Sequence, residues 1–428
     1  MNEQVVPGRQ PAARENWKAR FFTIWTGQQL SSIGSRLGRF ALVWWITATT
    51  GSATVLAMAT LVALLPEVLL APFVGAYVDR HNRRRIMILA DGFVALASAV
   101  LAYLFWSGQM QVWHVYVIML ARSLGETLHW PAMQASTSLM VPERHLARVA
   151  GMNSTMMGVL SVVAPPLGAL LLELLPLHGI MAIDVITALL AIVPLLFVGI
   201  PQPAPRPAAS GGATSLWAGV REGLTYVRAW PGLFRIMLMA ALLNFMLAPA
   251  GTLQPILVTK HFGGGALQLG WSNSAWGAGV ILGGLVLSLW GGFRRRVITS
   301  LAGLVGLGLG AGMVGLASAH LFAVGLAGLF VMGFMNPIVN GPLMATVQAK
   351  VAPEMQGRVF TIMQALAGAM MPLSMAIAGP VADALGVQVW FLIGGLTCIA
   401  MGIGALFVPS IMNLEAHAGP AAAEAAAD

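Results

Sequence analysis

Long apolar stretches separated by short polar segments run through nearly the whole chain. We predict twelve of them, each of about 20 residues or more, which is the length that a helix needs to cross the hydrocarbon core of a bilayer. The predicted spans lie at about 21–47, 53–77, 86–106, 112–134, 147–172, 179–199, 233–258, 266–290, 297–317, 319–344, 357–382 and 387–408. The pattern predicts an all-α membrane protein with twelve transmembrane helices in two six-helix halves.

The composition excludes a soluble or disordered protein. Of the 428 residues, 58% are hydrophobic and only 9% are charged, against about 25% charged in ordinary soluble domains. The single cysteine, Cys398, allows neither an internal disulfide nor a cysteine-based metal site. We expect no bound metal.

The basic residues predict the orientation, since short loops rich in Lys and Arg stay on the cytoplasmic side. With the N-terminus inside, 19 of the 23 Lys and Arg residues fall in the N-terminal arm, the central linker and the cytoplasmic loops. Only Lys260 falls outside, and Arg36, Arg39 and Arg122 fall within spans. We therefore expect a multi-pass protein of a bacterial-type inner (plasma) membrane with both termini cytoplasmic. The same distribution accounts for the net charge of +8 without a nucleic-acid partner.

A Pro- and Gly-rich run near the middle divides the chain. After it, residues 214–230 place apolar side chains on one helical face and charged side chains on the other. This pattern is typical of a helix on the membrane surface, although a solvated linker helix would also fit. The predicted parts are a cytoplasmic arm (1–20), a first half (21–199), a linker (200–232), a second half (233–410) and a cytoplasmic tail (411–428).

The two halves repeat each other at an offset of 211 residues. At this offset the triple-arginine loop 83–85 falls on 294–296, Pro142-Glu143 falls on Pro353-Glu354, and Gly168 falls on Gly379. A parallel repeat of two six-helix halves predicts a substrate site near the membrane midplane, between the halves.

Familiar enzyme motifs do not occur in the sequence. None of the three lysines follows a glycine in a phosphate-binding loop, and there is neither an H-E-x-x-H pair nor a G-x-S-x-G nucleophile elbow. We therefore expect neither an ATP-driven pump nor an enzyme, and no cofactor.

Charged residues inside the predicted spans are functional candidates, because a charge in the bilayer is costly. They lie in the first half: Arg36, Arg39, Glu67, Asp91, Arg122 and Glu126. Arg122 and Glu126 are four residues apart on one helical face, so they can pair. A buried carboxylate that alternates between a paired, ionised form and a neutral form can couple proton movement to a conformational change. We expect Glu67, Asp91, Arg122 and Glu126 to do so. The alternatives are static ion pairs and, for Asp91, support of the loop between spans two and three.

A polar stripe on the first span predicts one wall of a central cavity. Its members are Gln29, Ser32, Arg36 and Arg39, at helical spacing. Arg36 could contact an anionic or carbonyl group of a substrate, or pair with Glu67 or Glu126. The second half offers Asn244, Gln254, Asn336, Asn340 and Gln364. These side chains either line the cavity or bond neighbouring helices.

Residues 75–85 read G-A-Y-V-D-R-H-N-R-R-R. This segment resembles the signature loop of the major facilitator superfamily, G-x-x-x-D-R-x-x-R-R, and its details are similar to the branch of macrolide-efflux proteins and the enterobactin exporter. The resemblance implies that Asp79 faces the N-terminal end of span eleven, where a helix attracts negative charge. Asp79 would then gate the cytoplasmic side together with Gly75, Arg80 and Arg83.

A second resemblance lies in span five, where Pro165, Pro166 and Gly168 are similar to the glycine-proline motif of exporters. Together the resemblances imply a secondary efflux transporter. We expect it to export small amphipathic compounds, drug-like or siderophore-like, by proton antiport and alternating access, as a monomer. The proton gradient would be its energy source. The alternatives are a metabolite importer or uniporter of the same fold and a non-transporting membrane sensor or scaffold.

Overall fold

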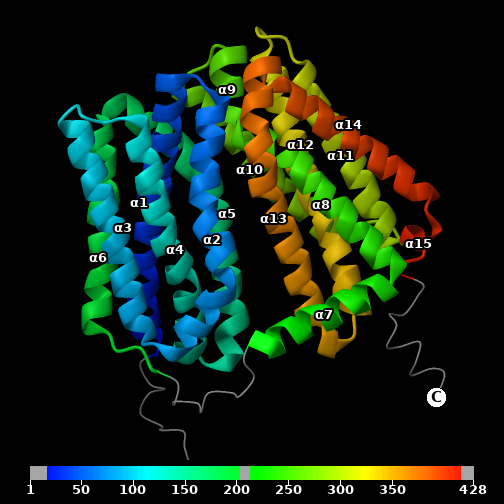
Figure 1. Cartoon of the computed structure of the whole chain (residues 1–428), viewed down its shortest axis with the longest axis horizontal. Helices are drawn as coiled ribbons and strands as arrows, with labels where there is room; N and C mark the ends of the chain where they lie inside the picture. The colour runs from blue at the N-terminus through cyan, green and yellow to red at the C-terminus, as the bar shows by residue number, and fades with distance from the viewer. Residues whose placement is uncertain (1–16, 203–212, 416–428) are drawn as a thin grey trace, which may run out of the picture.

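The chain folds into a bundle of long helices that run up and down between two ends (Figure 1). The computed structural model describes residues 17–202 and 213–415, and these residues contain no β-strand. The predicted cytoplasmic arm up to residue 16, the linker segment 203–212 and the tail from residue 416 lie outside the described residues.

Twelve long helices in the described chain correspond to the twelve predicted spans. The first six are α1 (Trp17–Thr50), α2 (Ala53–Arg80), α3 (Arg83–Trp106), α4 (Val112–Met140), α5 (Glu143–Leu174) and α6 (Leu177–Phe197). The other six are α8 (Pro231–Thr252), α10 (Ala266–Trp290), α11 (Arg296–Leu316), α12 (Phe322–Lys350), α13 (Pro353–Leu385) and α14 (Gln388–Gly404). The predicted cut between spans nine and ten is confirmed, because α11 ends and α12 begins on either side of Ser318 and His320.

Ten helices in the described part of the chain are long and apolar enough to cross a membrane. Helices α1 and α4 are not among the ten. These two helices carry Arg36, Arg39, Arg122 and Glu126, which lower their mean hydropathy. A spanning helix with such charges must turn them toward the interior of the bundle or toward a water-filled cavity.

Tight turns between consecutive helices explain the up-and-down order. Gly51 adopts a positive φ of 59° after α1, a conformation that glycine takes without strain. Ser52 then begins α2, and its hydroxyl accepts a hydrogen bond from the Val55 amide at 3.3 Å. At the other end of α2, Asn82 caps α3 in the same way through the Arg85 amide. Such short connections leave consecutive helices antiparallel.

The predicted seventh span, 233–258, is not one continuous helix. Helix α8 ends at Thr252, and the chain continues as a short helix α9 (Gln254–Ile256) and one turn of π-helix, η2 (Leu257–His261). Pro249 and Pro255 lack the amide hydrogens that a continuous helix would need here, which accounts for the break. π-Helical turns are frequent at functional sites.

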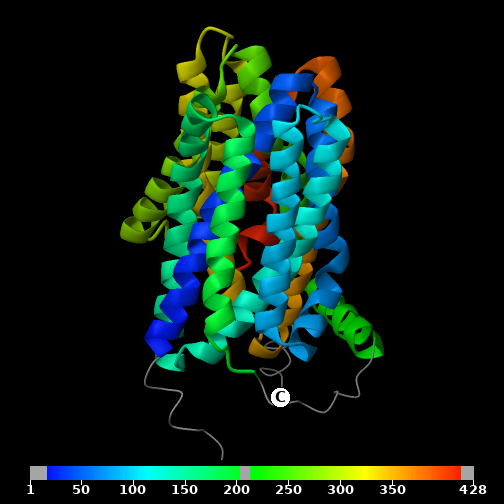
Figure 2. The same cartoon turned by 90° about the vertical axis from the view of Figure 1, so that its left-hand side faces the viewer.

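The helices form two groups, α1–α6 and α8–α14, which lie side by side (Figures 1 and 2). In the first group α1 packs on α5 and α6, and α3 packs on α4 and α6. In the second group α11 packs on α12 and α14, and α10 packs on α12. The main contacts between the groups are α5 with α10 and α2 with α13. We call the end with the 81–82 and 291–295 turns the basic end, and the end with the 51–52 and 386–387 turns the far end.

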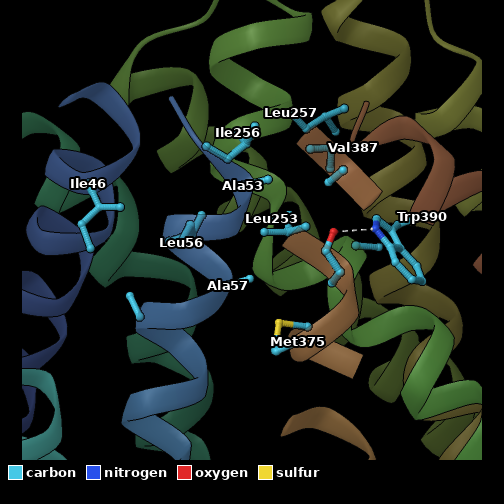
Figure 3. Close-up of a cluster of buried hydrophobic side chains, with 14 of the residues drawn as sticks. Ile46, Ala53, Leu56, Ala57, Leu253, Ile256, Leu257, Met375, Val387 and Trp390 are labelled. Carbon is cyan, nitrogen blue, oxygen red and sulfur yellow. Dashed lines mark hydrogen bonds between the residues drawn. The ribbon is translucent and has the colours of Figure 1, made fainter. Parts of the chain in front are cut away.

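One cluster of buried apolar side chains joins the two groups at the far end. It combines Ala53, Leu56 and Ala57 of α2 with Leu253 of the other group and with Met375 of α13 (Figure 3). The two further clusters of described residues each stay within one half and its neighbouring linker. The far end is therefore sealed, and toward the basic end the two halves have separate cores.

The linker helix α7 (Ala213–Ala229) packs against the second group of helices. In its described second half, Tyr226 and Val227 are buried among side chains of α8 and α13. Glu222 forms an ion pair with Arg358 of α13 at 2.5 Å. Tyr226 and Val227 therefore face protein, so this segment is not a purely solvated linker. The position of the helix on the membrane surface remains a prediction.

Candidate functional site

A cavity of about 760 Å³ lies between the two halves. All six helices of the first half, α1–α6, contribute to its lining, and the α8–α9 break and α10 line it from the second half. Leu56 belongs both to its lining and to the sealed far-end cluster. The cavity therefore ends at the far-end seal. This is the position, between the halves, that the internal repeat predicts.

The cavity brings together many of the predicted site residues from both halves. They are Gln29, Ser32, Arg36, Arg39, Asp91, Glu126, Pro165 and Gln254. Aromatic and sulfur-containing side chains such as Trp130, Trp276 and Met157 complete the wall. A large, partly apolar cavity with a few convergent polar groups is typical of a small-molecule site.

Four predicted cavity residues of the second half do not line this cavity: Asn244, Asn336, Asn340 and Gln364. The side-chain amide of Asn244 donates to the Ala240 carbonyl of its own helix at 2.9 Å. Asn340 donates to the Asn336 carbonyl at 3.0 Å in the same way. Asparagine can satisfy its donor within its own helix, so a polar residue in a span need not point into a cavity. The second half instead contributes Asn273, which the sequence analysis missed.

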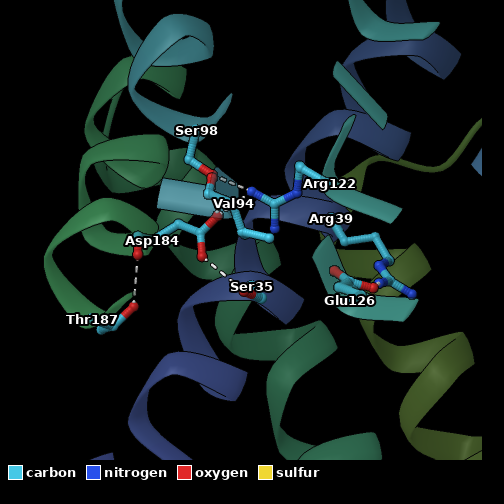
Figure 4. A network of polar contacts seen from close by, with 8 residues as sticks. All are labelled: Ser35, Arg39, Val94, Ser98, Arg122, Glu126, Asp184 and Thr187. Atoms are coloured by element: carbon cyan, nitrogen blue, oxygen red, sulfur yellow. Dashed lines mark hydrogen bonds and ion pairs between the residues drawn. The ribbon is translucent and has the colours of Figure 1, made fainter. Parts of the chain in front are cut away.

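Arg39 and Glu126 form an ion pair across the cavity wall, from α1 to α4 (Figure 4). The Arg39 Nη2 atom lies 2.5 Å from Glu126 Oε2, and the two side chains are 61% and 40% exposed. Arg36 lies one helical turn from Arg39 and also lines the cavity. Glu126 therefore lies beside two arginines at a surface that water and ligands can reach.

The predicted pairing of Arg122 with Glu126 is wrong. Arg122 forms a buried ion pair with Asp184 of α6, and Ser98 of α3 contacts both groups (Figure 4). The hydroxyl of Ser35 on α1 donates to the other Asp184 oxygen at 3.0 Å. The two ionised side chains are only 6% and 0% exposed. This network ties four helices together at the cavity wall: Ser35 lines the cavity, whereas Ser98, Arg122 and Asp184 lie behind it.

Asp184 was not predicted as a site residue from the sequence, although a usable signal was present. An acid within a predicted span is a candidate by default, and Asp184 lies inside the sixth span. The i,i+4 spacing of Arg122 and Glu126 shows only that they share a helical face. It does not show which neighbouring helix each side chain meets.

Asp91 forms a second polar group in the cavity wall. Its carboxylate accepts a hydrogen bond from Gln28 Nε2 at 2.9 Å, and His129 Nε2 lies 3.3 Å from its other oxygen. Asp91 is 7% exposed but borders the cavity, as do Gln28 and His129. A carboxylate beside an imidazole forms a pair that can gain or lose a proton. Asp91 was predicted as a site residue from the sequence, but its partners Gln28 and His129 were not.

Gln254 presents an unused hydrogen-bond donor at the cavity. It lies at the break after α8 and is 7% exposed, and its Nε2 atom is buried without a hydrogen-bond partner in the described protein. A buried donor without a partner costs free energy. A ligand oxygen that accepts from Gln254 would remove this cost.

Glu67 lies away from these groups. It is exposed on α2, does not line the cavity, and has no ion pair within the described residues. Of the alternatives for Arg36, the pairing with Glu67 is therefore not observed.

The loop between α2 and α3 contacts α4 and α6 of the first half and also Gln202 of the linker, whose side-chain oxygen accepts from the Arg83 amide at 3.1 Å. Arg83 is 8% exposed, and its guanidinium donates to the Ala135 carbonyl of α4 at 2.9 Å. Arg80 is exposed, and a Cβ added at Gly75 would meet no atom within 4 Å. The side chain of Asp79 lies outside the described part of the chain. The predicted gating contact with α13 therefore remains a prediction.

The predicted exporter-type motif lies where α5 crosses its neighbours. A Cβ on Gly168 would approach the Phe40 ring of α1 to 2.9 Å, and Gly270 of α10 lies directly against the Pro166 backbone. Pro165, one residue earlier, borders the cavity. The motif thus combines close helix packing with a place in the cavity wall.

A metal site is not found: no group of three or more His, Cys, Asp or Glu side chains within the described ranges could hold a metal ion.

Comparison with known proteins agrees with this geometry. The Major Facilitator Superfamily pattern matches residues 24–373. The chain is 32% identical over 400 residues to Macrolide efflux protein A of Streptococcus pyogenes, covering 94% of this chain and 98% of that protein. It is 26% identical over 418 residues to the Multidrug efflux pump Tap of Mycobacterium tuberculosis, covering 92% and 94%.

A bacterial homologue of the iron transporter ferroportin, solved in an inward-facing state, has a similar fold. The TM-score is 0.64 at 15% identity, over 89% of this chain and 99% of that one. The match to the family pattern covers most of the chain, and the relatives match along nearly their whole length. The chain therefore belongs to the Major Facilitator Superfamily, a family of multi-pass membrane transporters rather than of enzymes.

Proposed function

We propose that this protein exports small amphipathic compounds, drug-like or siderophore-like, in exchange for protons. The observation that carries the proposal is the Arg39–Glu126 ion pair in the wall of a cavity that is sealed at the far end. Relatives named for macrolide efflux and multidrug efflux support the direction of transport. The mixed lining of Trp, Met and sparse polar side chains suits amphipathic substrates of varied shape.

The basic end faces the cytoplasm in this proposal, because it carries most of the Lys and Arg residues. The protein acts as a monomer in the plasma membrane of a bacterial cell. The structure then corresponds to the state that loads its substrate from the cytoplasm, since the far end is sealed. Alternating access requires a second state in which the far end opens and the basic end closes.

Glu126 is the first proposed proton carrier. In the state with the far end sealed it is paired with Arg39, which stabilises the ionised carboxylate. When the cavity opens outward, a proton from outside neutralises Glu126, breaks the pair and changes the charge of the wall that holds the substrate. The proton leaves when the cavity faces the cytoplasm again and the pair re-forms.

Asp91 with His129 is the second proposed proton site, and Arg122 holds the wall in place through Asp184. Asp79, with Gly75, Arg80 and Arg83, gates the basic end by docking against the start of α13. No cofactor takes part, and the proton gradient supplies the energy.

The test is uptake of radiolabelled erythromycin into inside-out vesicles, in which export becomes accumulation. We expect accumulation that requires an acidic lumen, loss of it in Glu126→Gln, and normal accumulation in Glu173→Gln, which removes an exposed acid of α5 outside the cavity. Accumulation driven by an alkaline lumen would show an importer. Proton-coupled uptake by Glu126→Gln at the wild-type rate would contradict the assignment of the carrier.

A further inference from the structure

The two halves touch at the far end through one carboxylate that neither the family comparison nor the cavity accounts for. Asp383 lies in the last turn of α13 and reaches the start of α2 in the other half. Its Oδ1 accepts from the Ala53 amide at 2.8 Å. Its Oδ2 accepts from the Thr54 amide and from the Ser52 hydroxyl, each at 2.9 Å.

These contacts complete the N-terminus of α2. The first amides of a helix have no partner within the helix, and a negative charge there is stabilising. Ser52 satisfies the Val55 amide from within α2. The amides of Ala53 and Thr54 are satisfied by Asp383 from the opposite half. The residues that cap α2 thus come from both halves, and the two halves must separate for the far end to open.

The backbones also meet at this point, which makes the contact specific. One helical turn before Asp383, Gly379 lies against Thr54 so closely that a Cβ at this position would collide with the Thr54 Cα and lie 3.0 Å from its amide nitrogen. Only glycine allows this approach, and the approach brings Asp383 within hydrogen-bond distance. Directly beside the contact, Ala53 and Ala57 belong to the apolar far-end seal.

We propose that Asp383 is a positioning residue for transport: its carboxylate caps α2 across the gap between the halves and thereby holds the far end shut. The contact can break at low cost, because Asp383 is exposed and water can replace it at the two freed amides. Ser52 stays with α2 and keeps part of the cap when the halves part. The contact mirrors the predicted docking of Asp79 on α13 at the basic end, with the roles of the two helices exchanged.

The experiment measures the accessibility of each end with engineered cysteines and a membrane-impermeant maleimide. Ala57→Cys reports on the far end, where Ala57 is 1% exposed, and Gly75→Cys reports on the basic end. The native Cys398 is buried, so the unmodified chain is the blank. Right-side-out and inside-out vesicles present the two ends in turn. The labelling needs neither substrate nor a proton gradient. Its result therefore does not depend on the transport proposal, which is used only to say which side of the membrane each end faces.

We expect Asp383→Ala to raise far-end labelling several-fold and to lower basic-end labelling, because the population shifts to the state with the far end open. Asp383→Asn, which retains one acceptor oxygen, should lie between Asp383→Ala and the wild type. Gly379→Ala should act in the same direction without changing any charge. The matched control is Glu415→Ala, which removes a carboxylate that accepts from the Val297 amide at 2.7 Å within the second half.

Two results would overturn the proposal. One is unchanged far-end labelling in both Asp383→Ala and Gly379→Ala. The other is increased labelling at both ends, which would show that the variants loosen the fold instead of exchanging one state for the other. The Glu415→Ala control should label like the parent chain at both ends.

Discussion

The buried pair of Arg122 and Asp184 leads to a sharp prediction about stability. Asp184 is fully buried and accepts from Ser35 and Ser98 as well as from the guanidinium. Asp184→Ala removes all three acceptor contacts and leaves an uncompensated guanidinium at a site where one of its nitrogens, Nη2, already has no hydrogen-bond partner. Breaking a buried pair by removing one partner costs about 3–5 kcal/mol.

Two further variants separate charge from shape. Asp184→Asn keeps the size of the side chain and an acceptor for the serine hydroxyls, so we expect a loss of stability smaller than that of Asp184→Ala. A double variant, Arg122→Met with Asp184→Leu, removes both charges together. Replacing a buried pair with apolar groups of similar volume is often neutral or stabilising, so the double variant should lie closer to the wild type than Asp184→Ala does.

The assay is unfolding of the purified protein in mixed micelles with increasing dodecyl sulfate, followed by tryptophan fluorescence. The wild type, the single variants Arg122→Met and Asp184→Leu, and the double variant form a double-mutant cycle of four unfolding free energies. The reasoning is refuted if Asp184→Ala costs less than about 1 kcal/mol, since a buried and unpaired guanidinium must cost more than that. It is also refuted if the double variant loses the sum of the two single losses.

Three further predictions concern helix packing, the cavity and the basic-end gate. Gly279→Ala should cost about 1–3 kcal/mol of unfolding free energy, because its Cβ would collide with the α12 backbone, whereas Gly284→Ala, with no atom within 4 Å, should cost little in the same assay. Gln254→Leu should weaken erythromycin binding by up to roughly tenfold in a fluorescence titration, because one hydrogen bond to the ligand is lost. Gln364→Leu, which lies outside the cavity, should leave the affinity unchanged. Equal affinities of the two variants would refute the role of Gln254. Asp79→Asn should slow the exchange of substrate for protons in liposomes roughly tenfold at unchanged thermal stability, since a carboxylate at a helix N-terminus contributes up to about 2 kcal/mol. A wild-type rate would exclude the gating contact.

The fold was predictable because the hydropathy pattern extends over whole helices. A bilayer demands long apolar segments, and the chain supplies them clearly enough that even the short connection around Ser318 and His320 was located. The break after α8 was missed, although Pro249 and Pro255 were visible in the sequence. Prolines occur in several continuous helices of this protein, such as Pro131 of α4, so a proline alone does not identify the helix that breaks.

The site was predictable in part, for a different physical reason. Helical spacing correctly placed Gln29, Ser32, Arg36 and Arg39 on one cavity wall, because a single helix determines which residues share a face. The pairing of side chains from different helices depends on tertiary packing, which the spacing of residues along one helix does not determine. The partner of Arg122 was therefore assigned wrongly.

Two acids that matter in the structure were not singled out from the sequence. Asp184 lies in a span but its role depends on three other helices. Asp383 lies just beyond the predicted end of span eleven, where an acidic residue is expected to belong to a solvated loop. Its role becomes visible only when α2 is seen to begin directly beside it.

The exchange of protons for substrate is the central claim, and lumenal pH reports on it most directly. Proteoliposomes with an acidic lumen, oriented with the basic end outward, would contain the protein and a trapped pH indicator dye. Adding erythromycin outside should raise the lumenal pH as protons leave and the substrate enters, with no such response in Glu126→Gln. Entry of erythromycin without any change in lumenal pH, or an equal pH response in Glu126→Gln, would contradict the account.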